Sequence, residues 1–101
     1  MARYRMEDGT VVDTQNANHT WEAVSEFDGH NSVDIHTGSQ WVDQLLHRSR
    51  RGRYYTETKS RMQGSTDRAE WVSLEEAARW LLLAEAEIPG DLAEAAETVS
   101  E

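Results

Sequence analysis

A cluster of arginines beside two tyrosines is the part of this sequence best suited to binding chemistry. Four of the ten cationic residues fall within six positions, and two aromatic residues follow them: Arg48, Arg50, Arg51, Arg53, Tyr54 and Tyr55. Arginines neutralise phosphate groups, and a tyrosine ring can stack on a nucleobase. The pattern indicates a nucleic-acid contact across residues 48–61. The alternative, favoured by a pI of about 4.8, is a solvated hairpin whose arginines pair with carboxylates of the same chain.

Charge is segregated along the chain. Residues 44–68 carry seven Lys or Arg against two acidic residues, a local charge of +5, whereas residues 1–43 carry −6 and residues 69–101 carry −8. Such segregation bears on partners and solubility rather than on fold. We expect acidic side chains such as Glu75, Glu76 and Glu94 to contact a protein or ribonucleoprotein partner with a basic surface, with solubility as the simpler interpretation.

Two Asp-x-His units, Asp28-x-His30 and Asp34-x-His36, form a second pattern with ligand chemistry. Residues two apart on a strand point to the same face, so Asp34 and His36 could share a metal ion. Neither an H-E-x-x-H spacing nor a cysteine accompanies them. We therefore expect an outward-facing polar strand, with no metal and no cofactor.

The motifs of common enzymes are missing from the sequence. It contains no G-x-S-x-G elbow, no Walker-type loop and no G-x-G-x-x-G. The many glutamates fall on helix faces whose ordinary role is solvation. We expect no enzymatic activity and predict no catalytic residues.

Length and composition limit the class of protein. A chain of 101 residues fits a single domain, residues 1–101. The lack of cysteine excludes disulfides, thiol nucleophiles and Cys-ligated zinc. The longest apolar run extends only from Trp80 to Ala84, and the N-terminus lacks the apolar run of a signal peptide. We expect a cytoplasmic protein that does not engage a membrane.

The first part of the chain has the signals of β-structure. Two β-prone runs, residues 4–6 and 10–12, flank an Asp-Gly step that predicts a hairpin. Residues 20–27 fit either a short helix or a strand. Residues 32–37 alternate apolar and polar side chains, which predicts a half-buried strand with Val33 and Ile35 inward.

The basic cluster is predicted to lie at the tip of a second hairpin. Residues 40–46 fit a helical stripe as well as a strand, and we favour a strand for their second half. The reason is that residues 49–52 are typical of a hairpin loop, and residues 53–58 are rich in β-prone side chains.

The last third of the chain predicts a helical hairpin. Ser73 and Glu76 have the spacing of a capping box, so a helix should cover residues 74–86, and a second apolar stripe predicts a helix over 91–99. We expect an α+β fold: an antiparallel sheet of four to six strands within residues 3–72, packed on one face by the two helices of residues 73–100. The predicted core comprises Tyr4, Val11, Trp21, Val24, Val33, Ile35, Leu45, Tyr54, Trp71, Leu74, Ala78, Leu81, Leu82, Leu92 and Ala96.

In size, acidity and helix-plus-sheet make-up the chain resembles the small acidic inhibitors of phages and mobile elements, such as anti-CRISPRs. The resemblance implies a non-catalytic inhibitor or adaptor that binds another macromolecule, and it carries over no site residues. The alternative is a nucleic-acid-binding module that uses the basic hairpin of residues 48–55. A metal-dependent enzyme is the second alternative.

Overall fold

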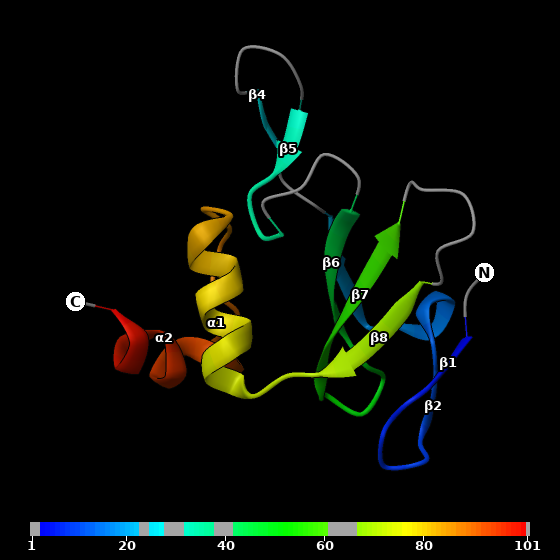
Figure 1. Cartoon of the computed structure of the whole chain (residues 1–101). Coiled ribbons are helices and arrows are strands. Elements are labelled where there is room, and N and C mark those ends of the chain that lie inside the picture. The colour runs from blue at the N-terminus through cyan, green and yellow to red at the C-terminus, as the bar shows by residue number, and fades with distance from the viewer. Residues whose placement is uncertain (1–2, 23–24, 28–31, 38–41, 61–66, 101) are drawn as a thin grey trace.

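The computed structural model shows an α+β fold, with two C-terminal helices on one face of a four-stranded sheet and an N-terminal hairpin on the other (Figure 1). Residues 3–22, 25–27, 32–37, 42–60 and 67–100 are described, those at 25–27 and 32–33 by their backbone alone. The predicted fold class is confirmed. Within these ranges no helix is both long and apolar enough to cross a lipid bilayer.

The four-stranded sheet is antiparallel and has the order β3-β6-β7-β8. Its strands are β3 (His19–Trp21), β6 (Val42–Arg48), β7 (Tyr54–Ser60) and β8 (Arg68–Trp71). The two long strands, β6 and β7, occupy the centre, and their pairing runs without a break from Val42↔Ser60 to Arg48↔Tyr54.

The loop between β6 and β7 is the arginine-rich tip that the sequence predicted. Ser49 N–H donates to the Arg53 carbonyl at 2.7 Å, and the Ser49 hydroxyl accepts from Arg53 N–H at 3.0 Å. Gly52 has a φ of +87°, a conformation that L side chains rarely adopt. A glycine in this position therefore lets Arg50 and Arg51 project from a tight turn.

The predicted N-terminal hairpin is also confirmed. It pairs β1 (Arg3–Arg5) with β2 (Val11–Asp13), and its turn contains Gly9 with a φ of +88°. The Asp8 carboxylate accepts from Thr10 N–H at 3.0 Å. Hydrogen bonds from the backbone and side chain of Thr10, followed by one from the Trp71 indole, hold the pKa of Asp8 well below its usual range. A short 3₁₀ turn, η1 (Thr14–Asn16), follows β2.

The helical interpretation of residues 20–27 is wrong. These residues contribute β3 and a separate strand, β4 (Ser25–Phe27), which pairs with β5 (Ser32–Asp34). The backbone of β3 pairs with β6, with Thr20 opposite His47, so tertiary pairing overrides the weak helical signal. The strand favoured for the second half of residues 40–46 is confirmed from Val42 onward, and residues 40 and 41 lie outside the described ranges.

The C-terminal helices contact each other, and the first is shorter than predicted. In α1 (Leu74–Leu83), Ser73 and Glu76 form the predicted capping box. The helix ends early because Glu85 takes a φ of +56°, with Ala86 N–H donating to the Leu81 carbonyl at 3.0 Å. The second helix begins as a 3₁₀ turn, η2 (Gly90–Leu92), and continues as α2 (Ala93–Val99).

Each face of the sheet contributes to its own apolar cluster. On the helix side the buried members are Leu46, Tyr54, Ala77, Ala78, Trp80, Leu81, Leu92, Ala95 and Ala96. On the side of the N-terminal hairpin they are Met6, Val12 and Tyr55.

The predicted core is only partly correct. Tyr54, Ala78, Leu81, Leu92 and Ala96 are buried, and the half-buried members are Tyr4, Trp21, Ile35, Leu45 and Trp71. Three members are exposed, and for these the prediction is wrong: Val11 by 62%, Leu74 by 48% and Leu82 by 39%. The side chains of Val24 and Val33 lie outside the described part of the chain.

Those errors have simple causes. Adjacent strand residues point to opposite faces, and β2 turns Val12 inward rather than Val11. Leu74 is the first residue of α1, and Leu82 lies beside the buried stripe rather than on it.

Candidate binding surfaces

The four arginines of the predicted site divide into two pairs. Arg48 Nε lies 3.2 Å from Asp91 Oδ2, and Arg53 Nη1 lies 3.3 Å from Asp8 Oδ2. The guanidinium of Arg53 also lies 3.8 Å from the centroid of a Trp71 ring, in cation–π contact. The alternative interpretation, in which the arginines pair with carboxylates of the same chain, therefore holds for Arg48 and Arg53.

Arg50 and Arg51 form the other pair. Both are exposed in the loop, and neither has an ion pair or a side-chain hydrogen bond with any described residue. They are the cations of the tip that are free to contact another molecule.

Tyr54 does not offer its ring to a partner. Its side chain is 1% exposed, and its hydroxyl donates to the Asp91 carboxylate at 3.0 Å from Oδ1 and 3.1 Å from Oδ2. Burial, with the hydrogen bond to Asp91, raises the pKa of Tyr54 to about 12. The suggested stacking of a tyrosine ring on a nucleobase has no support, because Tyr54 lies in the core beneath the helices and Tyr55 is also only 1% exposed.

The three predicted acidic contact residues, Glu75, Glu76 and Glu94, are all exposed on the C-terminal helices. Glu76 also accepts from Ser73 N–H in the capping box, at 3.4 Å. Beside them α1 exposes Leu82 by 39% and Leu83 by 55%. The helical hairpin thus presents carboxylates together with apolar side chains.

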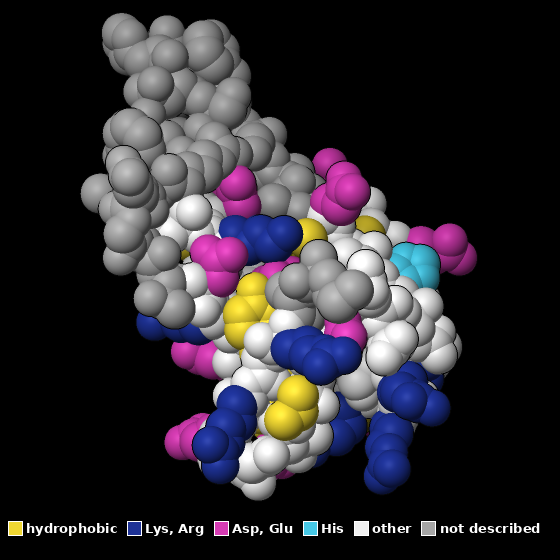
Figure 2. Space-filling view, turned by 90° about the vertical axis from the view of Figure 1, so that its right-hand side faces the viewer, with side chains coloured by type: hydrophobic (Ala, Val, Ile, Leu, Met, Phe, Trp, Pro, Cys, Tyr) yellow, Lys and Arg dark blue, Asp and Glu magenta, His cyan; other side chains and the backbone are white. Residues whose placement is uncertain are grey.

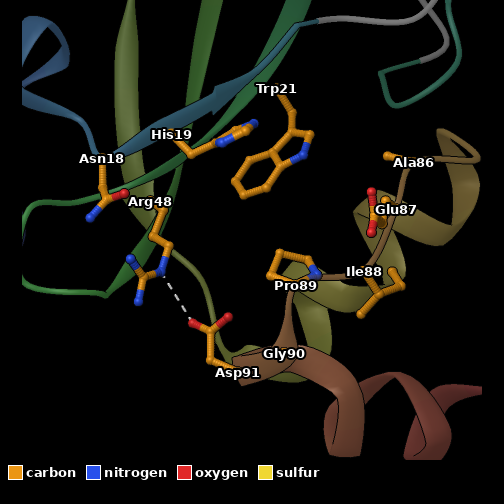
Figure 3. A pocket seen from close by; sticks show the side chains of 10 residues that line it. All are labelled: Asn18, His19, Trp21, Arg48, Ala86, Glu87, Ile88, Pro89, Gly90 and Asp91. Carbon is orange, nitrogen blue, oxygen red and sulfur yellow. Dashed lines mark hydrogen bonds and ion pairs between the residues drawn. The ribbon is translucent and has the colours of Figure 1, made fainter.

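A groove separates the sheet from the chain segment between α1 and η2, and we call it the Trp21 groove (Figure 3). Its volume is about 630 Å³. Trp21 and His19 of β3 line one side, with their ring centroids 4.2 Å apart, and residues 86–91 line the other. The Arg48–Asp91 ion pair crosses one end (Figure 3). An aromatic wall facing carboxylates can hold a cationic side chain.

Asp34 and His36 do not form the outward polar face that the sequence predicted. Their side chains are 0% and 2% exposed. The Asp34 carboxylate accepts from the N–H groups of His36 and Gln44 at 2.7 and 2.8 Å, and the His36 ring stacks on Trp80 with centroids 3.8 Å apart. Their role is to connect β5, β6 and α1.

The described residues contain no group of three or more His, Cys, Asp or Glu that could hold a metal ion. Asp28 and His30 lie outside the described residues. For the metal ion that Asp34 and His36 were suggested to share, the described residues therefore offer no third ligand.

A buried polar network is the feature that sequence reasoning missed. The Tyr4 hydroxyl donates to Glu57 Oε2 at 2.5 Å, His47 Nε2 lies 2.8 Å from Glu57 Oε1, and the Thr20 hydroxyl lies 2.8 Å from His47 Nδ1. Burial, together with the hydrogen bond to Glu57, raises the pKa of Tyr4 well above its usual range. Glu57 is one of two acidic residues in the basic segment of residues 44–68. Its unusual place in that segment was the sequence signal that could have pointed to the network.

Comparison with known proteins gives no relative: no family model, no curated protein and no solved structure matches the chain. The candidate surfaces are therefore argued from the residues of this chain alone.

Proposed function

We propose that the protein acts without catalysis, by binding another protein that presents a cationic surface, as a small acidic inhibitor or adaptor would. The observation that carries the proposal is the Trp21 groove, where an aromatic ring faces the carboxylates of Glu87 and Asp91 (Figure 3). Because Asp91 already pairs with Arg48, Glu87 is the carboxylate left to meet an incoming Lys or Arg. Such a side chain would stack on Trp21 while its charge lies near Glu87.

The surroundings of the groove support the same kind of partner. Residues 69–101 carry a charge of −8, and Glu75 and Glu94 are exposed on the adjoining helices. Acidic patches of this kind raise the association rate with a cationic partner, whereas buried anchors set the dissociation rate. The exposed Leu82 and Leu83 supply apolar area beside the charges.

The test compares two variants of equal charge on a partner first captured with the wild-type protein and then purified. One carries Glu75→Lys, Glu87→Lys and Glu94→Lys; the control carries Glu7→Lys, Glu22→Lys and Glu70→Lys, also at exposed positions. Each raises the net charge by six from −9. At low salt the first variant should slow association about 10-fold relative to the control. Equal rates would show that net charge alone matters and that the helical surface is not the interface.

The aromatic anchor has its own test. Trp21→Leu keeps apolar bulk but removes the ring face, and we expect it to speed dissociation by about 10-fold or more. Melting curves of the free variant verify that the fold is intact. An unchanged dissociation rate in a folded variant would contradict the role of the Trp21 groove.

A further inference from the structure

A second groove lies on the other face of the sheet, between the N-terminal hairpin and the tip of the β6–β7 hairpin, and we call it the arginine groove. Its volume is about 790 Å³, within the roughly 300–1,000 Å³ of small-molecule sites. The residues that line it include Arg50, Arg51 and Arg53 from the tip, Val11 from β2, and Tyr55 from β7. It shares no residue with the Trp21 groove.

The electrostatics of the arginine groove favour an anion. Three arginines line it against one carboxylate, Asp13, which lies 3.4 Å from Arg3 Nε. Arg53 is held by Asp8 and Trp71, whereas Arg50 and Arg51 are unpaired among the described residues. Figure 2 shows this side of the molecule, with Lys and Arg side chains gathered over its lower half. Three of the ten cationic residues of an otherwise acidic protein thus line one cavity.

The hydroxyl of Tyr55 is an independent sign of a ligand. Tyr55 lines the groove and is 1% exposed, yet its hydroxyl has no hydrogen-bond partner among the residues that the structure describes. The hydroxyls of Tyr4 and Tyr54 both donate to carboxylates. Burial raises the pKa of Tyr55 to about 12, so the group keeps its proton at neutral pH and remains a donor. Buried polar groups are nearly always paired, and a phenylalanine would fill the same space without the cost.

The donors of the groove match a phosphoryl group better than a carboxylate. The residues that line the groove include arginines of the loop and two residues with hydroxyl groups, Ser49 and Tyr55, and a phosphoryl group offers three or more oxygens to such donors. Arg50 and Arg51 are not held by ion pairs, so they can rearrange around a bound anion. Val11, 62% exposed at the rim, gives the remainder of the ligand an apolar contact.

We propose that the arginine groove binds a phosphate ester, with Arg50 and Arg51 neutralising the phosphoryl oxygens and the Tyr55 hydroxyl donating a hydrogen bond to one of them. The phosphoryl group belongs either to the backbone of a single-stranded nucleic acid or to a small phosphorylated compound such as a nucleotide. The site is separate from the acidic helical surface, so either proposal can fail without the other.

Calorimetric titration at low ionic strength tests the site, with inorganic phosphate, a nucleoside monophosphate and a short single-stranded oligonucleotide as probes. Binding of the nucleoside monophosphate identifies a free phosphate ester as the ligand, and binding of inorganic phosphate shows that the phosphoryl group alone is recognised. Binding of the oligonucleotide alone identifies the nucleic-acid backbone. Absence of binding by all three overturns the proposal.

Variants decide whether the binding occurs in the groove. Arg50→Gln with Arg51→Gln should weaken binding ~10–100-fold and lower the slope of log affinity against log salt by ~1–2. The control, Lys59→Gln with Arg79→Gln, removes the same charge at exposed positions away from the groove and should change affinity less than ~2-fold. If both double variants weaken binding equally, attraction is diffuse and the proposal is wrong.

Tyr55→Phe is the sharpest variant, because it removes one oxygen and no charge. We expect affinity to fall about 10-fold with the salt dependence unchanged, as for the loss of one hydrogen bond to a charged group. The melting temperature of the free protein should not fall, since no described residue accepts a hydrogen bond from this hydroxyl. Unchanged affinity in Tyr55→Phe overturns the proposal.

Discussion

The two faces of the central sheet are built by different means. The face beneath α1 and α2 buries nine apolar residues in one cluster, with Tyr54 and Leu46 as the sheet's contribution. The face beneath the N-terminal hairpin buries only three, and beside them lies the hydrogen-bonded network of Tyr4, Glu57 and His47.

This difference shows where stability and specificity come from. Full burial of a large apolar side chain contributes ~1.5–3 kcal/mol, whereas a typical hydrogen bond contributes ~0.5–1.5 kcal/mol net. The helix face should therefore supply most of the free energy of folding. The network fixes how the N-terminal hairpin docks on the sheet, because Glu57 receives the hydrogen bond from Tyr4 only when the hairpin lies in one position.

The largest effect is expected from truncation on the helix face. Leu81 is fully buried in the main cluster, so Leu81→Ala should lower the free energy of unfolding by ~2–5 kcal/mol through lost burial and a residual cavity. Leu83→Ala, at a position 55% exposed on the same helix, serves as the control and should cost less than ~0.5 kcal/mol. Urea unfolding measures both values. Similar losses in the two variants would contradict the assignment of the core.

A smaller effect is expected from the network. Glu57→Gln keeps the shape of the side chain but removes the charge that accepts from Tyr4 and His47, and we expect a loss of ~1–3 kcal/mol. The exposed Glu70 of β8 provides the matched control, because Glu70→Gln should change stability by less than ~0.5 kcal/mol. A loss in Glu57→Gln as large as that in Leu81→Ala would mean that the faces contribute equally.

The smallest effects separate two neighbouring tyrosines that point to opposite faces. Tyr54→Phe removes a hydroxyl bonded to Asp91 and should cost ~1 kcal/mol. Tyr55→Phe removes a buried hydroxyl that has no partner in the described part of the chain, and it should be neutral or slightly stabilising in the free protein. Thermal unfolding of the two variants side by side measures the difference. The opposite order would show that Tyr55 has a partner in solution.

Much of the fold could be predicted because local signals agree with it. The Asp-Gly turn, the hairpin loop predicted at residues 49–52 and the Ser73 capping box each act within a few residues. All three are confirmed, and the loop extends one residue further, to Arg53. The helical interpretation of residues 20–27 failed since its outcome depends on pairing with β6, some 27 residues away between Thr20 and His47. The local secondary-structure propensity of residues 20–27 contains no information about this long-range strand pairing.

The candidate surfaces were less predictable for the same reason. The sequence predicted all four arginines of the tip as contact residues, and it could not show that Arg48 and Arg53 pair with carboxylates 43 and 45 positions away. It also could not predict which of Tyr54 and Tyr55 faces the helices. Adjacent strand residues point to opposite faces, and the sequence does not show which face the helices cover. The Trp21 groove joins residues of β3 to the segment before η2, a juxtaposition that only the tertiary fold creates.

The short outer strands of the sheet have a consequence for self-association. The edge strands β3 and β8 are three and four residues long, while the seven-residue strands lie inside. On β8 the side chains of Arg68 and Glu70 are 71% and 67% exposed. Short edge strands leave few backbone groups for another strand to extend, and the charges on β8 add to this protection against edge-to-edge aggregation. The edges of this four-stranded sheet are therefore poor templates for a strand added by another molecule.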